Sequence, residues 1–223
     1  VLALNTIAFT VCFACWMING VLVTFLVENQ VFHWTESQVG LLIGTPVLTG
    51  ALLRLPAGLL TDKYGGKAVF IVLMLLSAVP MYLLSMATEY WHFIVASLGF
   101  GLTGASFAVG VAYTSIWFDK KHQGTALGIF GAGNSGAALT SLFAPTLLTR
   151  LTAGGEQLDA WRTLPKLYAA VLLVMTIVFA MGAFSRKPIQ TKTHGMRDRL
   201  APLKHMRVWR FGLYYFLTFG GFV

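Results

Sequence analysis

The stretch GALLRLPAGLLTDKYGGK, residues 50–67, places one arginine, Arg54, inside an apolar run and ends in a polar turn. The nearest acid in the sequence is Asp62, eight residues further on, which is about 12 Å along a helix. A charged side chain at the middle of a bilayer costs at least about 2.5–3.5 kcal/mol, so such residues face a bundle interior or an aqueous cavity. Arg54 is therefore a candidate binding residue for an anion.

The composition around this stretch indicates a membrane protein. The chain is 57% hydrophobic and only 11% charged, with a mean hydropathy of +0.73, whereas an average soluble domain carries roughly 25% charged residues. Because a helix needs about 20 apolar residues to cross a bilayer, we predict an all-α polytopic membrane protein. Its spans are expected at residues 3–27, 38–61, 68–87, 92–116, 124–149, 164–184 and from 211 onward.

The ends of the chain and its long polar connection predict how it is divided. The sequence begins at Val1 and stops at Val223 inside an apolar segment, and its first apolar run is too long for a cleaved signal peptide. We expect an internal piece of a longer protein that lacks a substantial C-terminal part. The predicted parts are a six-helix bundle (residues 1–184), a basic cytoplasmic interdomain loop (185–210) and the truncated start of a second bundle (211–223).

Most Lys and Arg residues fall in the connections on one side of the predicted bundle. Three lie on the opposite side, and Arg54 alone lies within a span. The residues on the first side are Lys63, Lys67, Lys120, Lys121, Arg186, Lys187, Lys192, Arg197, Arg199, Lys204, Arg207 and Arg210. The positive-inside rule makes that side cytoplasmic, which predicts a multi-pass protein of the cell inner (plasma) membrane. The net charge of +8 then reflects topology and not nucleic-acid binding.

Other roles compete with anion binding for Arg54. The side chain could pair with an acid outside this chain, donate to backbone carbonyls freed near Pro56, or extend toward the interface. We favour anion binding because the planar guanidinium offers a fork of donors that matches planar oxyanions.

The end of the opening stretch, GLLTDKYGGK (residues 58–67), carries a motif with a known context. Its pattern of Gly58, Asp62, Gly65 and Lys67 resembles the signature of the loop between the second and third spans of the major facilitator superfamily. Gly58 would allow close helix approach, Asp62 would accept from helix N-termini or basic side chains, and Gly65 would turn the chain. The resemblance implies a gating role for this motif and a major facilitator fold.

A second motif narrows the resemblance. GIFGAGNSGAAL (residues 128–139) is similar to a glycine- and asparagine-containing signature of the nitrate/nitrite porters. The resemblance implies that Arg54 binds the substrate, together with an arginine from the half of the protein outside this chain. It also implies substrate-binding roles for Phe107 in GASFAVG and for Tyr215 and Phe219 in YYFLTFGGF.

Asn134 and its glycines can be interpreted without the family. The amide donors of Asn134 must find an acceptor in hydrocarbon, either on a substrate or on a neighbouring helix. Gly131, Gly133 and Gly136 leave room beside it for a close helix or a small ligand. Asn134, Arg54 and the two phenylalanines of the site lie roughly 12–18 Å from their expected cytoplasmic helix ends, in the midplane band where secondary transporters bind substrate. Tyr215 is shallower, at about 8 Å.

These features predict a secondary active transporter for nitrate, nitrite or both, working by alternating access. Its expected partners are the anion, the lipid bilayer and the missing C-terminal half. Two alternatives stay open: a major facilitator carrier for another small anion, and a non-transporting membrane sensor or partner subunit. The sequence shows no nucleophile–base pair, cofactor motif or metal-ligand spacing, so we expect no enzyme, no cofactor and no metal site. Cys12 and Cys15 are interpreted as packing residues, and the coupling ion stays open.

Overall fold

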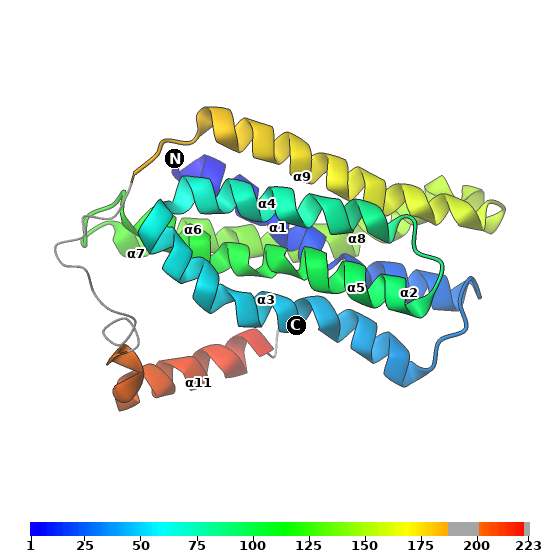
Figure 1. Ribbon diagram of the computed structural model, residues 1–223, viewed down its shortest axis with the longest axis horizontal. Coiled ribbons are helices and arrows are strands. Elements are labelled where there is room, and N and C mark those ends of the chain that lie inside the picture. The colour runs from blue at the N-terminus through cyan, green and yellow to red at the C-terminus, as the bar shows by residue number, and fades with distance from the viewer. Residues whose placement is uncertain (187–200, 221–223) are drawn as a thin grey trace. The chain divides into compact units, whose positions relative to one another are not determined.

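The structure, a computed structural model, describes residues 1–186 and 201–220, without the side chains of residues 202, 219 and 220. The chain divides into two compact units, Val1–Pro188 (unit 1) and Ile189–Val223 (unit 2). Every regular element in the described ranges is helical (Figure 1). The all-α class expected from the hydropathy pattern is therefore confirmed.

Unit 1 contains six helical spans at the expected places, with bounds that differ from the prediction by a few residues. The spans are α1 (Leu2–Trp16) with α2 (Ile18–Glu28); α3 (Glu36–Tyr64); α4 (Gly66–Leu84); α5 (Tyr90–Phe100), η1 (Gly101–Ala105) and α6 (Ser106–Ser115); α7 (Gln123–Gly131), η2 (Ala132–Asn134) and α8 (Ser135–Leu151); and α9 (Thr163–Gly182). Two short 3-10 turns, η3 (Ala153–Gly155) and η4 (Leu158–Arg162), precede α9.

Five of the described helical stretches are long and apolar enough to cross a membrane: Leu2–Glu28, Glu36–Tyr64, Gly66–Leu84, Tyr90–Ser115 and Leu158–Gly182. The fifth span of unit 1, residues 123–151, is rich in Gly, Ala, Ser and Thr and is not among them. A span of this composition is suited to close helix packing, because small residues let two backbones approach.

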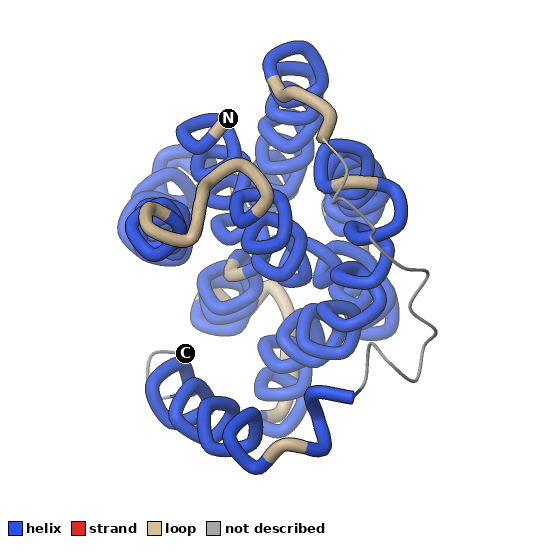
Figure 2. Tube along the Cα trace, turned by 90° about the vertical axis from the view of Figure 1, so that its left-hand side faces the viewer, coloured by secondary structure: helices blue, strands red, loops and turns tan. Residues whose placement is uncertain are grey.

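The helices of unit 1 run back and forth, so that the connections alternate between its two ends (Figure 1). The N-terminus, Gly65 and residues 116–122 lie at one end, and residues 29–35, 85–89 and 152–162 lie at the other. Viewed from the first end, the helices appear nearly end-on (Figure 2). Lys63 and Lys67 flank the Gly65 connection, and Lys120 and Lys121 lie in residues 116–122, so these four lysines belong to connections at the same end of unit 1. That this end faces the cytoplasm stays a prediction.

Three spans are interrupted near their midpoints. The first is broken at Met17, between α1 and α2, and the fourth and fifth contain the 3-10 segments Gly101–Ala105 and Ala132–Asn134. A 3-10 segment is tighter than an α-helix and has poorer hydrogen-bond geometry. One carbonyl of the segment Gly101–Ala105, that of Gly104, accepts a hydrogen bond from the side chain of Arg54.

The connection between α3 and α4 corrects one prediction. Residues 62–67 were expected to form a loop, but α3 continues to Tyr64, α4 begins at Gly66, and Gly65 alone joins them with φ 88°. Asp62 therefore lies in the last turn of α3 and Lys67 in the first turn of α4. Gly58 does not mark a close approach either, since a Cβ built there meets no atom within 4 Å. Gly66 does, because a Cβ there would collide with the Tyr113 ring.

Buried asparagines join the first span to the fourth. Asn5 donates from Nδ2 to the Gly110 carbonyl oxygen at 3.0 Å and to Thr114 Oγ1 at 2.7 Å. Near the opposite end, Asn19 donates to Ser97 Oγ and to the Leu42 carbonyl oxygen, both at 2.7 Å. Because hydrocarbon offers no competing water, these bonds fix the first span against its neighbours. Cys12 and Cys15, between the two asparagines, are free and buried.

Unit 2 contains two described helical elements, η5 (Ala201–Lys204) and α11 (Met206–Gly220). The Trp209 indole donates to the Leu203 carbonyl oxygen at 2.8 Å, which ties α11 to η5. The helix begins at Met206, before the expected residue 211. Part of the predicted 185–210 loop lies outside the described residues, and the three-part division of the chain stays a prediction.

Candidate functional site

The second and fourth spans cross at glycines. A Cβ built on Gly50 of α3 would lie 3.0 Å from the Gly104 Cα and 3.1 Å from the Gly101 carbonyl oxygen. One built on Gly101 would lie 2.7 Å from the Cα of Pro46. The two backbones therefore approach more closely than any side chain would permit. This crossing brings the 3-10 segment of the fourth span beside α3.

Trp16, from the first span, packs against this crossing. Its side chain is 1% exposed, and its Nε1–H donates to the Pro46 carbonyl oxygen at 2.7 Å. A Cβ on Gly104 would lie 2.6 Å from the Nε1 and Cε2 atoms of the indole. Three spans therefore meet at one indole ring.

Arg54 lies four residues after Gly50, on the same side of α3. It is half-buried, and its Nε–H donates to the Gly104 carbonyl oxygen at 3.4 Å. Its Cζ atom lies 5.8 Å from the centroid of the Trp16 ring and 5.7 Å from that of Phe107. Cation–π contacts at such distances contribute about 0.5–2 kcal/mol each. A backbone acceptor and two aromatic rings thus hold the guanidinium in place.

Phe107 rests on buried aromatic rings from other spans. Its ring centroid lies 5.6 Å from that of Phe9 and 6.1 Å from that of Phe130, and Phe9 and Phe130 stack at 4.7 Å. Both of these neighbours are fully buried, whereas Phe107 is half-buried. Packing therefore fixes the position of Phe107, and Arg54 and Phe107 are brought together as the sequence suggested.

Asn134 makes a local contact. Its Nδ2 donates to the Gly131 carbonyl oxygen at 2.8 Å, within the same turn of the fifth span. This bond differs from both expectations for Asn134, a bond to another helix or to a ligand, and it satisfies one of the two donors of the amide. A Cβ on Gly131 would meet no atom within 4 Å, so the surface next to Asn134 is open there.

Gly133 and Gly136 pack the fifth span on the first. A Cβ on Gly133 would collide with the Phe9 ring and lie 3.1 Å from the Thr6 carbonyl oxygen. A Cβ on Gly136 would collide with the Thr10 carbonyl oxygen. Since Phe9 also contacts Phe107, Gly133 is linked to the Arg54 region through an aromatic side chain. The sequence left open whether these glycines make room for a close helix or for a small ligand. At Gly133 and Gly136 the structure shows a close helix.

The remaining predicted site residues lie in unit 2. Tyr215 and Phe219 belong to α11, and the side chain of Phe219 lies outside the described structure. Their roles in a site with Arg54 therefore stay predictions.

Sequence reasoning missed Trp16 and the glycine pair Gly50 and Gly104. A signal for Trp16 was present, because an indole N–H in the middle of a span needs an acceptor that hydrocarbon cannot supply. The sequence does not show which acceptor that is. Gly50, Gly101 and Gly104 carry no sequence signal that pairs them across two helices.

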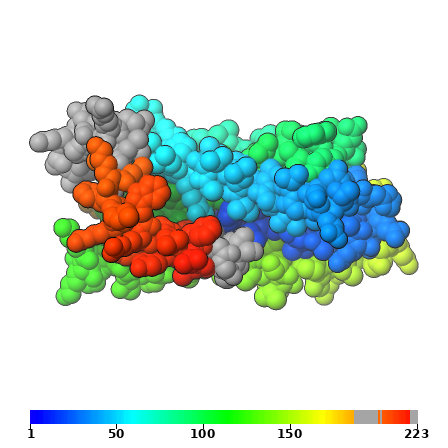
Figure 3. Space-filling view, turned by 90° about the horizontal axis from the view of Figure 1, so that it is seen from below, coloured from blue at the N-terminus to red at the C-terminus, as the bar shows by residue number. Residues whose placement is uncertain are grey.

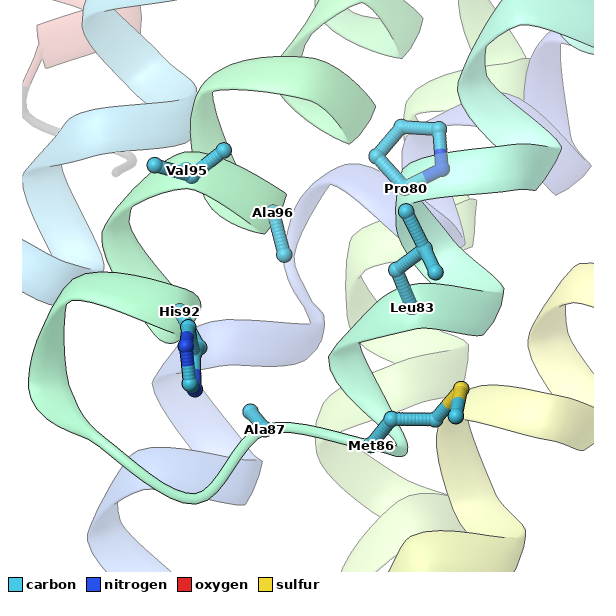
Figure 4. Close-up of a pocket in the computed structure, with 7 residues that line it drawn as sticks. All are labelled: Pro80, Leu83, Met86, Ala87, His92, Val95 and Ala96. Atoms are coloured by element: carbon cyan, nitrogen blue, oxygen red, sulfur yellow. The ribbon is translucent and has the colours of Figure 1, made fainter.

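Two larger cavities of unit 1 lie away from Arg54. One of about 350 Å³ opens between α4 and α5 at the end opposite the N-terminus (Figure 4). Its lining residues are Pro80, Leu83, Met86, Ala87, His92, Val95 and Ala96. His92, its one titratable lining residue, accepts from the Glu89 backbone N–H at 3.3 Å and so caps α5. Another, of about 420 Å³, lies between α4 and α9.

Arg54 is a permanent cation set beside the rings of Trp16 and Phe107. The described residues contain no group of three or more His, Cys, Asp or Glu side chains that could hold a metal ion. A permanent cation between aromatic faces attracts a negative ligand, and the half-buried setting strengthens that attraction relative to bulk water.

The family model for the Major Facilitator Superfamily matches residues 4–223. Over its whole length the chain is 40% identical to the "Probable nitrate/nitrite antiporter NarK1" of Thermus thermophilus and covers 51% of that protein. It is 28% identical to the "Nitrite extrusion protein" of Bacillus subtilis (strain 168), of which it covers 53%, again over its whole length.

A solved structure shows the same fold. The crystal structure of the Major Facilitator Superfamily transporter FucP in the outward conformation matches with a TM-score of 0.62 at 18% identity, over 92% of this chain and 56% of that one. The chain spans about half the length of the curated relatives it matches. The expected fold and the expected resemblance to nitrate/nitrite porters are both confirmed.

Proposed function

The chain belongs to the Major Facilitator Superfamily, and we propose that the whole protein carries nitrate, nitrite or both across the membrane by alternating access. A member of this superfamily with five apolar membrane-length helices is a multi-pass membrane protein. We place it in the cytoplasmic membrane, with the lysine-rich end of unit 1 inside the cell. The names of its relatives, a nitrate/nitrite antiporter and a nitrite extrusion protein, support this choice of substrate.

One observation carries the proposal: Arg54 lies half-buried in the middle of a span, between the rings of Trp16 and Phe107. Keeping a guanidinium at this depth is costly unless it faces a cavity or a partner. Among the five membrane-length helices of the described residues, the one that carries Arg54 is the least covered, with 17% of its apolar window buried against 39–56% for the other four. It runs along one face of unit 1 (Figure 3), a surface suited to the second half of the transporter.

The surroundings of Arg54 favour a flat, weakly hydrated anion. A guanidinium donates through a planar fork, which matches the planar oxygens of nitrate and nitrite. Aromatic walls offer no hydrogen bonds to replace lost hydration, so an anion that holds water strongly, such as phosphate, loses more on entry than nitrate does. The expected selectivity therefore follows from shape and hydration together.

The rest of the site is proposed from the porter resemblance. Asn134 would offer its second amide donor to the anion, with the open surface at Gly131 beside it. Gly133 would act through Phe9, by keeping the fifth span close to the first. Tyr215, Phe219 and an arginine of the missing half would close the site from the other bundle. The motif of Gly58, Asp62, Gly65 and Lys67 would latch the cytoplasmic end between transport states.

Exchange of anions by the full-length protein tests the proposal. Purified protein in proteoliposomes loaded with nitrate should take up labelled nitrite. In the Arg54→Lys variant this uptake rate should fall at least tenfold, because the lysine ammonium, a point charge, cannot reproduce the planar fork of donors. Arg162→Lys is a matched control: Arg162 also contacts a tryptophan, at 4.7 Å from Trp161, and donates to two carbonyl oxygens, but at the far end of unit 1. A rate near wild type for Arg54→Lys would defeat the assignment.

Competition separates nitrate from other anions. An excess of unlabelled nitrate should suppress uptake of labelled nitrite, whereas phosphate or a carboxylate at the same concentration should not. Suppression by phosphate or a carboxylate would instead identify a carrier for another small anion. Absence of any uptake, with folded protein in the vesicles, would favour a sensor or partner subunit.

A further inference from the structure

We propose that Trp16 is a positioning residue for Arg54, so that the affinity for the transported anion depends on its indole ring. The proposal rests on the proposed function for the role of Arg54 as the anion-binding charge. Trp16 belongs to the first span, and it is not among the site residues that the resemblance to porters implied.

The indole is fixed by contacts on several sides. Its ring is fully buried, and Nε1–H donates to the Pro46 carbonyl oxygen at 2.7 Å. Its ring centroid lies 4.9 Å from that of Phe13, one turn earlier in the first span. With a bulky ring held by packing and a short hydrogen bond, Trp16 has little freedom to move.

Trp16 reaches Arg54 along two routes. The Arg54 Cζ lies 5.8 Å from the ring centroid, so the indole is one wall of the guanidinium site. The acceptor of the Arg54 Nε–H is the carbonyl of Gly104, and the pyrrole edge of the indole packs on that same glycine. At 3.4 Å this hydrogen bond is long, close to the limit at which such bonds weaken. A small shift of Gly104 would therefore break this hydrogen bond.

Phenylalanine cannot replace these contacts. The indole atoms nearest to a Cβ built on Gly104 are Nε1 and Cε2, and Nε1 is also the atom nearest to one built on Gly50. A phenyl ring lacks this edge and has no donor for the Pro46 carbonyl. The Trp16→Phe variant would therefore keep an aromatic face near Arg54 while it loosens the crossing of the second and fourth spans.

The experiment compares Trp16→Phe with Trp161→Phe in the full-length protein. Both tryptophans are fully buried, but Trp161 lies in an aromatic cluster with Phe32 and Phe93, at the end opposite the N-terminus. Nitrate/nitrite exchange in proteoliposomes gives KM and the maximal rate for each variant at matched protein amount. We expect Trp16→Phe to raise KM about tenfold, which corresponds to about 1.4 kcal/mol. We expect Trp161→Phe to leave KM near wild type, even if both variants melt at a lower temperature.

A second pair of variants, Gly50→Ala and Gly44→Ala, tests the proposal if the Trp16→Phe protein does not accumulate in cells. Gly50→Ala would place a Cβ 2.9 Å from the indole Nε1, whereas Gly44→Ala, on the same helix, meets no atom within 4 Å. The same Cβ would also lie 3.0 Å from the Gly104 Cα, so a raised KM in Gly50→Ala alone would support positioning of Arg54 by the contact between Trp16, Gly50 and Gly104. An unchanged KM in Gly50→Ala would count against the positioning role.

The possible outcomes separate this proposal from the one it rests on. Equal KM values in Trp16→Phe and Trp161→Phe, while Arg54→Lys still reduces exchange at least tenfold, would overturn the positioning role and leave the proposed function intact. Failure of Arg54→Lys to reduce exchange would overturn the proposed function first, and the positioning role with it.

Discussion

Replacing Gly133 by alanine should destabilise unit 1, whereas the same change at Gly131 should not. A Cβ on Gly133 would collide with the Phe9 ring and lie 3.1 Å from the backbone oxygen of Thr6. Phe9 cannot turn away freely, because it is fully buried and stacks on Phe130 at 4.7 Å. A Cβ on Gly131 meets no atom within 4 Å.

The expected size of the effect follows from two terms. Overpacking a filled core costs about 1–3 kcal/mol, and replacing a helical glycine by alanine gains about 0.5–1 kcal/mol. The second term is common to both variants and cancels when they are compared. Their unfolding free energies should therefore differ by the overpacking term alone. With about 2–4 °C of melting temperature per kcal/mol in chains of 150–250 residues, and less in a longer chain, we expect Gly133→Ala to melt roughly 2–6 °C below Gly131→Ala.

Thermal unfolding of the full-length protein in detergent, followed by tryptophan fluorescence, measures this difference. Gly131→Ala should melt at or slightly above the wild-type temperature. If the two variants melt together, or if Gly131→Ala is the less stable one, the packing of the fifth span on the first through Gly133 is wrong.

Two further predictions concern the first span. Asn5→Ala should lower the unfolding free energy by about 1–2 kcal/mol, because the hydrogen bonds to Gly110 and Thr114 are lost. Each such bond in a membrane contributes on average about 0.6 and at most about 1.7 kcal/mol. An unchanged melting curve would contradict the buried hydrogen bonds of Asn5. Cys12 and Cys15 should react with a maleimide only after denaturation, since both are buried; mass spectrometry measures this, and rapid labelling of native protein would show that the first span is not packed as described.

The spans could be predicted from sequence because hydropathy reports the apolar stretches directly. The helix ends were less predictable, as α3 shows. Asp62 and Lys63 are too polar for the bilayer, so the span was expected to end at residue 61, yet the helix continues to Tyr64. Hydropathy marks where the hydrocarbon ends, whereas a helix can extend beyond it into water.

The candidate site was predictable in its charge but not in its surroundings. Arg54 could be identified from sequence because it is the one Lys or Arg in the interior of a predicted span, where a buried cation is costly. The partners of Arg54 depend on how three spans pack, and Trp16 precedes it by 38 positions. The pairing of Gly50 with Gly104 likewise requires knowing which helices cross. The acceptor of Asn134 is instead a carbonyl of its own turn, so this contact does not depend on how the spans pack, although it was not predicted.

The oxygen that receives the Arg54 hydrogen bond belongs to the main chain of Gly104. No amino-acid replacement deletes a peptide carbonyl, so point mutation cannot remove this acceptor and can only shift it. In a saturation library at residue 104, the rate of nitrite uptake should therefore fall with the volume of the new side chain and not with its polarity. Serine and alanine should keep a higher rate than aspartate, leucine and lysine.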